Sequence, residues 1–371
     1  KFEIKKFLSH NKRYYELNMT QSRVFVRYSP YFSLIGKLLP LLVLLIGGYL
    51  FLQGELTLGA LSAFVQYSTN IVWPMEMLGW LSNDFSSAVG SYRKIRKVYD
   101  QKPSIQEPEE PIVLPEVTGD IRFEHVSFHK EDQHEILHDI HFHVEAGKTI
   151  GIMGATGSGK TSLIQLLCRL YDATGGTIYL DNVDIRKLSL RQLRSCISTV
   201  MQDVFLFSDT IQENVMLGQK GSLNISDVRL ASRDAQASES IDRLSEQYDH
   251  VTGARGVGSS GGKKHRISIA RALAKHTPVL VLDDSTSALD METEYAIQQT
   301  LTRLPHTTKL IIAHRISAVR HADEIIVLEN GHIAERGTHE ELLALHGLYY
   351  QTWQAQFGMM PDQKEVTDYG C

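Results

Sequence analysis

A glycine-rich segment between an apolar run and an amphipathic run constrains the fold of this chain most. Residues 154–161, Gly-Ala-Thr-Gly-Ser-Gly-Lys-Thr, match the pattern G-x-x-x-x-G-K-[ST]. They follow the strand-like residues 149–153 and precede the helix-like residues 162–168. In this context the glycines let backbone N–H groups surround a polyphosphate at a helix N-terminus. An ordinary glycine-rich turn is the alternative, but it does not require the full spacing, so the segment predicts a nucleoside-triphosphate-binding loop.

The residues of this loop have distinct expected roles. Lys160 would reach the β- and γ-phosphates, and the Thr161 hydroxyl would ligate Mg²⁺. The residues expected to hold the nucleotide are Gly154, Thr156, Gly157, Ser158, Gly159, Lys160, Thr161 and Ser162.

Composition excludes several other classes of protein. The chain has 371 residues, 43% of them apolar, and a net charge of −5, so it has no global basic field for nucleic acid. The cysteines, Cys168, Cys196 and Cys371, are spread out, which fits a reducing compartment and neither a disulfide framework nor a metal site. The first residue is Lys1, with no signal peptide, which suggests a piece of a longer protein.

The first hundred residues contain two candidate membrane spans. Residues 30–52 carry one charge, Lys37, over a length that can cross a bilayer. Residues 60–80 form a second, more polar span, in which Gln66, Asn70 and Glu76 indicate a face shielded from lipid. A soluble amphipathic hairpin is the alternative, but the first span is too apolar for a surface helix. Lys37 and Glu76 either line a substrate path or snorkel and pair between helices.

Basic residues predict the orientation of these spans. Several precede the first span and a cluster follows the second, whereas the short connection at 53–59 has no Lys or Arg. The positive-inside rule therefore predicts that both ends lie in the cytoplasm, with residues 1–98 forming a multi-pass segment of the cell (inner or plasma) membrane. The basic residues are Lys1, Lys5, Lys6, Lys12, Arg13, Arg23 and Arg27 before the spans, and Arg93, Lys94, Arg96 and Lys97 after them.

The remainder of the chain divides into three predicted parts. Residues 99–118 contain four prolines among glutamates and predict a linker. Residues 119–357 alternate strand-like and helical patterns, as in a layered α/β domain. Residues 358–371 have no periodicity and predict a disordered tail.

Three further segments carry polar residues after apolar, strand-like runs. Residues 278–282 are followed by Asp283, expected to hold Mg²⁺, and Asp284, expected to be a general base or to orient water. Residues 309–313 end at His314, which would contact the γ-phosphate if this strand lies beside residues 278–282. Residues 197–201 end at Gln202, between the P-loop and the two acids.

A second phosphate cradle is predicted at residues 258–266. Small residues there precede an amphipathic helix. One triphosphate has no use for two cradles in one subunit, which suggests a site shared between two chains.

With these motifs in this order, the chain resembles the ATP-binding cassette superfamily, and more narrowly the type IV exporters that fuse a six-helix membrane half to a nucleotide-binding domain. The resemblance covers residues 119–357 as an ABC ATPase domain of the α/β P-loop NTPase fold. It covers residues 1–98 as the last two membrane helices, an all-α transmembrane hairpin.

The resemblance implies a head-to-tail dimer with two ATP molecules between the nucleotide domains. By position, the signature residues Ser260, Gly261 and Gly262 would bind the partner's γ-phosphate, and Asp290 would be the D-loop acid. Thr161, Gln202 and Asp283 would serve Mg²⁺, while Asp284, His314 and Gln202 would take part in catalysis.

Four positions depart from the family pattern. Asp284 stands where the family has Glu, and residues 259–263, Ser-Ser-Gly-Gly-Lys, replace Leu-Ser-Gly-Gly-Gln. Lys130 replaces the aromatic residue that stacks on adenine, so it would contact the base through its stem or by a cation–π interaction. Ala254 replaces a common Glu. Weakened sites of this kind are typical of one half of a heterodimeric exporter.

The sequence thus predicts an ATP-hydrolysing subunit of an exporter, with ATP and Mg²⁺ as cofactors, a lipid bilayer around it and a second half-transporter as partner. A heterodimer is favoured, and a homodimer stays open because His314 is retained. The exported substrate is not readable, and nucleic acid is not an expected partner. The alternatives are a catalytically weak regulatory half and a membrane-anchored ATPase without transport.

Overall fold

The fold was analysed in a computed structural model that describes residues 2–130, 135–219, 221–253 and 261–358. The chain divides into two compact units, Lys1–Lys102 and Pro103–Cys371, called unit 1 and unit 2 below. Each is described by itself.

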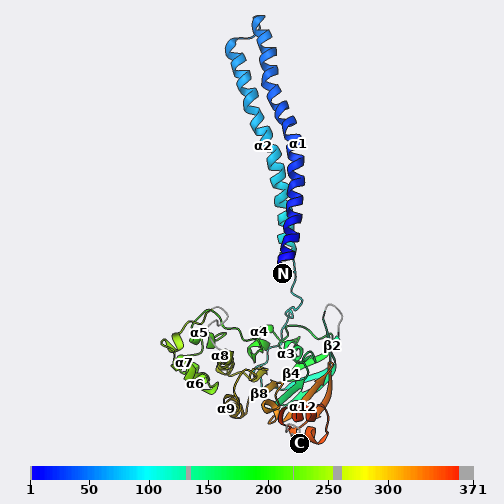
Figure 1. Ribbon diagram of the computed structural model, residues 1–371, viewed down its shortest axis with the longest axis vertical. Helices are drawn as coiled ribbons and strands as arrows, with labels where there is room; N and C mark the ends of the chain where they lie inside the picture. Colours follow the sequence, from blue (N-terminus) through cyan, green and yellow to red (C-terminus); the bar gives the residue numbers. More distant parts are fainter. Residues whose placement is uncertain (1, 131–134, 220, 254–260, 359–371) are drawn as a thin grey trace, which may run out of the picture. The chain divides into compact units, whose positions relative to one another are not determined.

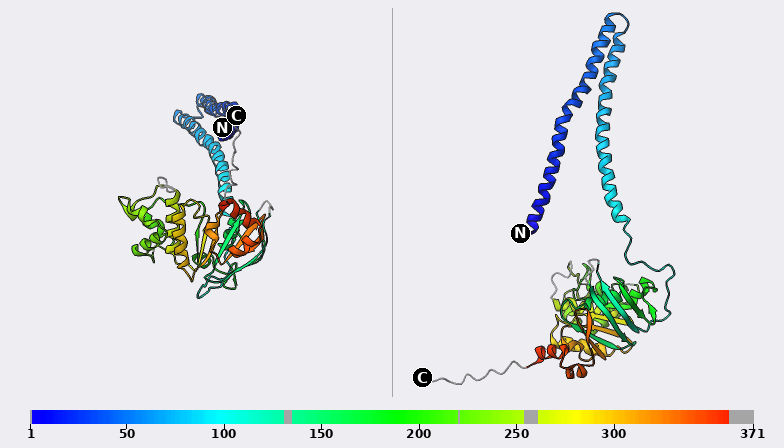
Figure 2. Two further views of the ribbon diagram at one scale, coloured as in Figure 1. Left: turned by 60° about the horizontal axis from the view of Figure 1, so that its bottom comes forward. Right: turned by 90° about the vertical axis from the view of Figure 1, so that its right-hand side faces the viewer.

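Unit 1 is a hairpin of two long helices, α1 (Phe2–Leu52) and α2 (Leu58–Tyr99), which Figures 1 and 2 show running antiparallel. The Thr57 side chain begins α2 by accepting a hydrogen bond from the Ala60 N–H at 3.2 Å. Both helices extend well beyond the predicted spans of residues 30–52 and 60–80, because the charged flanking residues continue the helical hydrogen bonding. Within the described residues, only Ile4–Leu52 is long and apolar enough to cross a bilayer.

The two helices of unit 1 pack against each other near their connection. A Cβ added at Gly47 would lie 2.6 Å from the Leu61 side chain, whereas one added at Gly48 would meet nothing within 4 Å. Gly47 therefore faces α2, and its small size permits the contact. Leu61 is the one large apolar residue of unit 1 that is buried among those whose side chains are described.

A six-stranded, mainly parallel sheet forms the centre of unit 2. Its order is β10-β9-β3-β8-β7-β6, and β10 alone runs antiparallel to its neighbour. The strands are β3 (Thr149–Gly154), β6 (Ile197–Val200), β7 (Val279–Asp283), β8 (Thr308–Ile312), β9 (Glu324–Glu329) and β10 (His332–Gly337).

Alternating residues of this sheet face two separate cores. Val279 and Val281 of β7 pack into one core together with Leu166 of α3 (Lys160–Leu167), while Leu280 and Leu282 pack into the other with the helices from α5 (Ile211–Val215) to α9 (Met291–Thr302). This is the period of two that a strand imposes on its side chains. Burial on both faces explains why the central strands β3, β7, β8 and β9 read as largely apolar runs in the sequence.

A second, antiparallel sheet of four strands covers one face of unit 2. Its order is β2-β1-β4-β5, and the Phe123 and Phe142 rings of β1 and β2 stack at 4.5 Å inside the core that α3 shares. The strands are β1 (Ile121–His129), β2 (Glu135–Val144), β4 (Gly175–Leu180) and β5 (Val183–Asp184).

In Figure 1, the helices α5–α8 gather on one side of unit 2, whereas α3 lies near β4 of the antiparallel sheet. The helix α8 packs against α5, α6 and β6. The helices are α3 (Lys160–Leu167), α4 (Leu190–Ser195), α5 (Ile211–Val215), α6 (Ile225–Asp234), α7 (Ser238–Asp242), the 3₁₀ turn Gln247–Asp249, α8 (Gly261–Ala274), α9 (Met291–Thr302), α10 (Ile316–Val319), α11 (His339–Ala344) and α12 (Leu348–Phe357).

Residues 106–120 are fastened to unit 2 along much of their length, although they form no helix. The buried Arg169 donates to the Gln106 carbonyl at 3.0 Å, and the Gln192 side chain bonds both the N–H and the carbonyl of Leu114. The Asp181 carboxylate accepts from the N–H groups of residues 118–120. Most of the segment predicted as a linker is therefore a strap on unit 2, and we use that name for residues 106–120.

Candidate functional site

The predicted site residues converge at the carboxyl ends of adjacent parallel strands. The P-loop follows β3, His314 follows β8, Asp283 and Asp284 lie at the end of β7, and Gln202 follows β6. The strand β8 lies between β3 and β7, so the prediction that His314 follows a strand beside the two acids is confirmed. Ligands of open α/β sheets bind at this edge.

Glycine is required at two positions of the P-loop by positive φ and close neighbouring atoms. A Cβ on Gly154 (φ 147°) would lie 2.3 Å from the Leu328 carbonyl oxygen, and one on Gly159 (φ 102°) would lie 2.5 Å from the Leu137 side chain. Positive φ and missing space both exclude other residues there. The loop thereby passes tightly from β3 into α3, whose N-terminus begins at Lys160.

Lys160 and Ser158 form the polar floor of this loop. The Lys160 ammonium donates to the carbonyls of Gly154 and Ala155, each at 2.8 Å. Burial lowers the pKa of Lys160, an effect that the nearby Asp283 and Asp284 oppose. The Ser158 hydroxyl is buried and has no hydrogen-bond partner among the described residues. A buried hydroxyl without a partner fits a ligand oxygen at this position.

Thr161 and Asp283 meet where Mg²⁺ is expected. The Thr161 hydroxyl donates to an Asp283 carboxylate oxygen at 3.2 Å. Burial raises the pKa of Asp283, which is 2% exposed, while the Thr161 hydroxyl and the Lys160 ammonium counteract this rise. A hydroxyl and a carboxylate side by side are the oxygen ligands that Mg²⁺ prefers. The described residues therefore fit the metal, and Gln202 offers a further oxygen.

Asp284 and Gln202 face each other at the same edge. The Gln202 amide donates to an Asp284 carboxylate oxygen at 3.4 Å. The Asp284 backbone N–H donates to the Ile312 carbonyl at 2.8 Å, which ties the residue to β8. Asp284 has φ 46°, in the left-handed region that Asp tolerates better than most residues. Asp284 as a whole is 9% exposed and thus lies at the edge of the buried core.

His314 is exposed, and its main chain is held by a residue that the sequence analysis missed. The Gln356 amide of α12 donates to the His314 carbonyl at 2.7 Å. Forty-two positions separate the two residues. Gln356 belongs to no sequence motif. Its contact with His314 could be predicted only if the packing position of α12 were known.

Other predicted residues are not gathered at this edge. Gly261 and Gly262 begin α8, which Figure 1 shows among α5–α7 and apart from α3. Ser260 and Ala254 lie outside the described residues. Lys130 is exposed directly after β1, and Asp290 caps α9 by accepting from the Thr293 N–H at 2.9 Å. Thr156 is exposed and Ser162 half-buried within the P-loop and first turn of α3.

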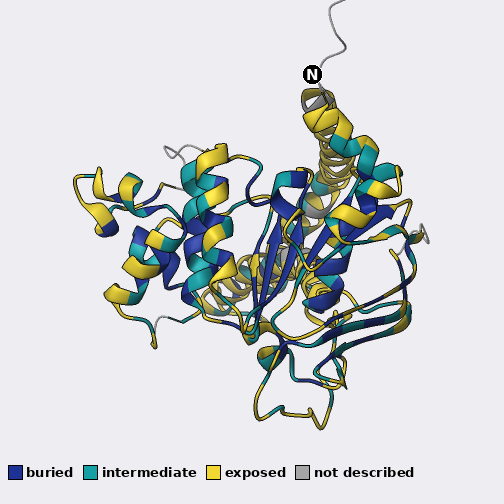
Figure 3. Ribbon diagram, turned by 90° about the horizontal axis from the view of Figure 1, so that it is seen from below, coloured by how far each residue is buried: buried dark blue, intermediate teal, exposed yellow. Residues whose placement is uncertain are grey.

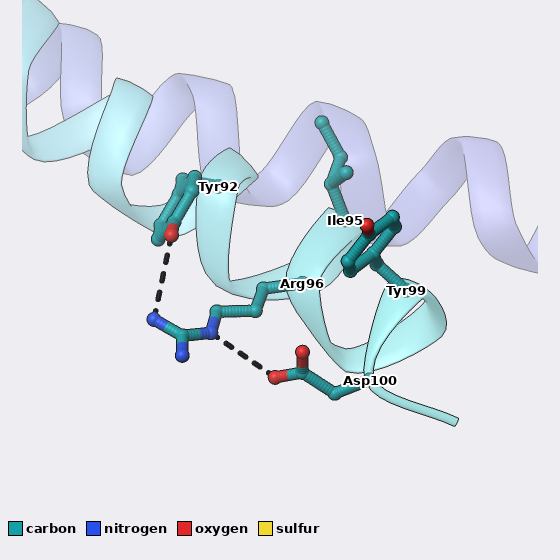
Figure 4. A pocket seen from close by; sticks show the side chains of 5 residues that line it. All are labelled: Tyr92, Ile95, Arg96, Tyr99 and Asp100. Atoms are coloured by element: carbon teal, nitrogen blue, oxygen red, sulfur yellow. Dashed lines mark hydrogen bonds and ion pairs between the residues drawn. The ribbon is translucent and has the colours of Figure 1, made fainter. Parts of the chain in front are cut away.

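Two surface hollows lie away from these residues. One, of about 380 Å³, is formed on α2 in unit 1, where Arg96 bonds Tyr92 and Asp100 (Figure 4). The other, of about 300 Å³, lies at the amino ends of β3 and β9, beside the ion pair of Lys148 and Asp323. Neither hollow contains a residue of the predicted nucleotide site.

Comparisons with known proteins agree with this geometry. The ABC transporter family matches residues 137–287. The chain is 39% identical over 358 residues to an uncharacterized ABC transporter ATP-binding protein, YknU, of Bacillus subtilis, covering 96% of this chain and 61% of the relative. It is 36% identical to an ATP-dependent lipid A-core flippase of Syntrophus aciditrophicus, covering 96% of this chain and 59% of the relative.

A solved structure is also similar. A bacterial Atm1-family ABC exporter with ATP bound matches with a TM-score of 0.88 and 33% identity, over 95% of this chain and 62% of that one. The chain therefore spans about three-fifths of the length of these relatives. From its motifs, its fold and these relatives, unit 2 contains an ABC transporter ATPase domain, and the chain is similar to an ABC exporter over 95% of its length.

Proposed function

We propose that the chain is the C-terminal part of an exporter half-transporter that hydrolyses ATP to drive transport. The observation that carries the proposal is the convergence of Lys160, Thr161, Asp283, Asp284 and His314 at one sheet edge, in a chain whose α1 can cross a bilayer. The similarity to exporters, permeases and flippases supports a membrane location.

The site residues divide the chemistry of phosphoryl transfer between them. Lys160 and the P-loop backbone bind the phosphates, and Thr161, Asp283 and Gln202 would hold Mg²⁺. When bound, the metal would supply positive charge beside the phosphates. Asp284 orients the attacking water, and the Gln202 amide holds the Asp284 carboxylate by a hydrogen bond. His314 contacts the γ-phosphate. Positioning carries most of the rate enhancement in such reactions.

We infer that a second half-transporter completes the site. The signature glycines Gly261 and Gly262 begin α8, apart from the P-loop of their own chain, so they are available to a neighbour's phosphates. Lys263 adjoins them in the first turn of α8. A cation there favours ATP binding by the partner's site.

The shortened carboxylate favours a heterodimer. Asp is one methylene shorter than Glu, which withdraws the carboxylate by roughly 1.5 Å, the length of one carbon–carbon bond. A misplacement of about 1 Å can cost on the order of 10²-fold in rate. The chain's own site then binds ATP and hydrolyses it slowly. A partner with Glu at the corresponding position supplies most of the ATP turnover. A homodimer, with Asp284 as its base, is the second candidate because His314 is retained.

The proposed ATPase is tested in the complete half-transporter. Lys160→Ala should abolish binding of a fluorescent ATP analogue and ATP hydrolysis, because it removes the P-loop cation. Lys187→Ala, at an exposed position near the strap, is the matched control. Unchanged nucleotide affinity of Lys160→Ala would remove the P-loop assignment.

The degenerate site is tested by ATPase measurements with and without the partner. Asp284→Glu should raise turnover at this site. Asp284→Asn should change total turnover little in a heterodimer and nearly abolish it in a homodimer. A fast wild-type homodimer with no gain from Asp284→Glu would contradict the degenerate site.

The proposed topology has its own test. A cysteine at Thr57, in an otherwise cysteine-free half-transporter, should react with an impermeant thiol reagent added outside intact cells. Thr57 begins α2 at the connection between the two helices. Reaction only after lysis would contradict the outside location of this connection.

A further inference from the structure

The segment that carries His314 is held from α12 by a single side-chain amide. Gln356 donates from Nε2 to the His314 carbonyl at 2.7 Å and accepts at Oε1 from the Ile316 N–H at 2.9 Å. The two bonds lie two residues apart in the main chain, so they fix the backbone on both sides of Arg315. The intervening chain has little freedom left to rotate.

The same segment is held on its other side by α9. The Gln298 amide donates to the Ser317 carbonyl at 2.7 Å. The buried Glu294 carboxylate accepts from the hydroxyls of Ser317 at 3.3 Å and Thr286 at 3.1 Å. Since Thr286 follows Asp284 closely in sequence, α9 ties the His314 segment to the segment that carries the acid.

The position of Gln356 is itself defined by the packing of α12. Tyr349, in the first turn of this helix, is 1% exposed, and its hydroxyl bonds His339 at 2.7 Å. The Glu335 carboxylate of β10 accepts from the N–H groups of Leu348 and Tyr349 at the helix start. The helix is therefore docked at its beginning and presents Gln356 near its end.

We propose that Gln356 is a positioning residue for His314, so that α12 sets the geometry of γ-phosphate contact. The inference rests on the ATPase activity proposed above. A simpler role would be a cap for α10, whose first residue is Ile316 and whose N-cap, Arg315, makes no side-chain capping bond. Capping explains the bond to the Ile316 N–H but not the bond to the His314 carbonyl. The second bond therefore distinguishes the two roles.

Substitutions at Gln356 separate these roles. Gln356→Ala removes both bonds. Gln356→Glu keeps an acceptor for the Ile316 N–H but has no donor for the His314 carbonyl. Gln354→Ala, at an exposed position of the same helix, is the matched control. Each variant is made in the complete half-transporter with the partner it requires.

Steady-state ATPase kinetics provide the first measurement. Gln356→Ala and Gln356→Glu should each lower kcat about tenfold, because even a misplacement of about 1 Å can cost on the order of 10²-fold in rate, with the KM for ATP unchanged. Gln354→Ala should behave as the wild type. In a His314→Ala background, Gln356→Ala should cause no further loss, because residues that act through one another are not additive. Wild-type kcat in Gln356→Glu, or an additive loss in the double variant, would overturn the proposal.

Amide hydrogen exchange provides a measurement that does not depend on turnover. Exchange of the Ile316 amide should be faster in Gln356→Ala and close to wild type in Gln356→Glu, which keeps the acceptor. Unchanged exchange in Gln356→Ala would also overturn the proposal. A wild type without any ATP turnover would instead contradict the proposed function, and Ile316 exchange would still decide whether Gln356 holds the segment.

Discussion

The two units treat apolar side chains in opposite ways. In unit 1, residues such as Leu45 and Tyr49 of α1 are each 62% exposed, and Leu61 is the one large apolar residue buried among the described side chains. In unit 2, Ile121, Phe123 and many others are fully buried, as the dark ribbon of Figure 3 shows. Unit 2 thus buries its own core, whereas the apolar surface of unit 1 has to be covered by lipid or by further helices.

Separating the units gives the largest expected effect. Residues 103–371 expressed alone should be soluble and monodisperse without detergent, because both cores lie within them. Residues 1–102 alone should aggregate unless detergent is present. Size-exclusion chromatography of both pieces, with and without detergent, is the measurement. If residues 1–102 stayed monomeric in buffer, the apolar surface of unit 1 would not need the covering that distinguishes it from unit 2.

Two leucine substitutions compare the units by their effect on the free energy of unfolding. Leu166→Ala, at 0% exposure in α3, should lower the free energy of unfolding of unit 2 by about 2–5 kcal/mol, since it leaves a cavity. Leu44→Ala, at 51% exposure in α1, should change the same transition by less than about 0.5 kcal/mol. Denaturant unfolding of the half-transporter in micelles measures both. Similar losses would mean that α1 and unit 2 unfold as one.

A pair of glycines tests the packing that does exist inside unit 1. Gly47→Leu should destabilise the hairpin by about 1–3 kcal/mol through overpacking against Leu61. Gly48→Leu, next to it but facing open space, is the control and should have little effect. Unfolding of residues 1–102 in mixed micelles, followed by helical circular dichroism, is the measurement. Equal effects would show that the helices do not pack at Gly47.

The smallest expected effect is a pH-dependent one. Burial alone would raise the pKa of Asp323, but the Thr149 N–H and the Lys148 ammonium hold it below its ordinary value. The carboxylate therefore stabilises unit 2 above the pKa of the unfolded state, and this contribution is lost as pH falls through the folded-state pKa.

Asp323→Asn should accordingly lower the stability of unit 2 at neutral pH by less than about 1 kcal/mol, because the ion pair is half-exposed. The difference from wild type should vanish in acid. Asp84→Asn, on the exposed surface of α2, is the control. Thermal unfolding over a pH series measures both variants. A stability difference between wild type and Asp323→Asn that grows in acid would contradict a stabilising role for the ionised Asp323 carboxylate.

The parts of the fold that depend on local pattern were predictable. The strand expected at residues 149–153 is β3, the helix expected at 162–168 corresponds to α3, and the apolar runs before Asp283 and His314 are β7 and β8. The α/β P-loop domain behind a helical hairpin is confirmed. Parallel strands bring their carboxyl ends to one edge, which is why the nucleotide residues could be grouped from sequence.

Features that depend on distant contacts were not predictable. The role of Gln356 requires that α12 return to the end of β8, and the strap requires Asp181 and Arg169 to lie beside residues 106–120. Prolines and glutamates indicate only that a segment forms no helix, not whether other residues bind it. The functional roles assigned to Asp284, His314 and the signature glycines stay predictions.

The strap shortens the free segment of chain that connects the two units. The helix α2 ends at Tyr99, and Arg169 donates a hydrogen bond to the Gln106 carbonyl. Only residues 100–105 therefore form the free connection between the two units. Fully extended, such a segment reaches about 20 Å. A displacement of unit 2 beyond this length would therefore pull on the last turn of α2. At the other end the same pull would act on Arg169, two residues past the helix that begins with Lys160.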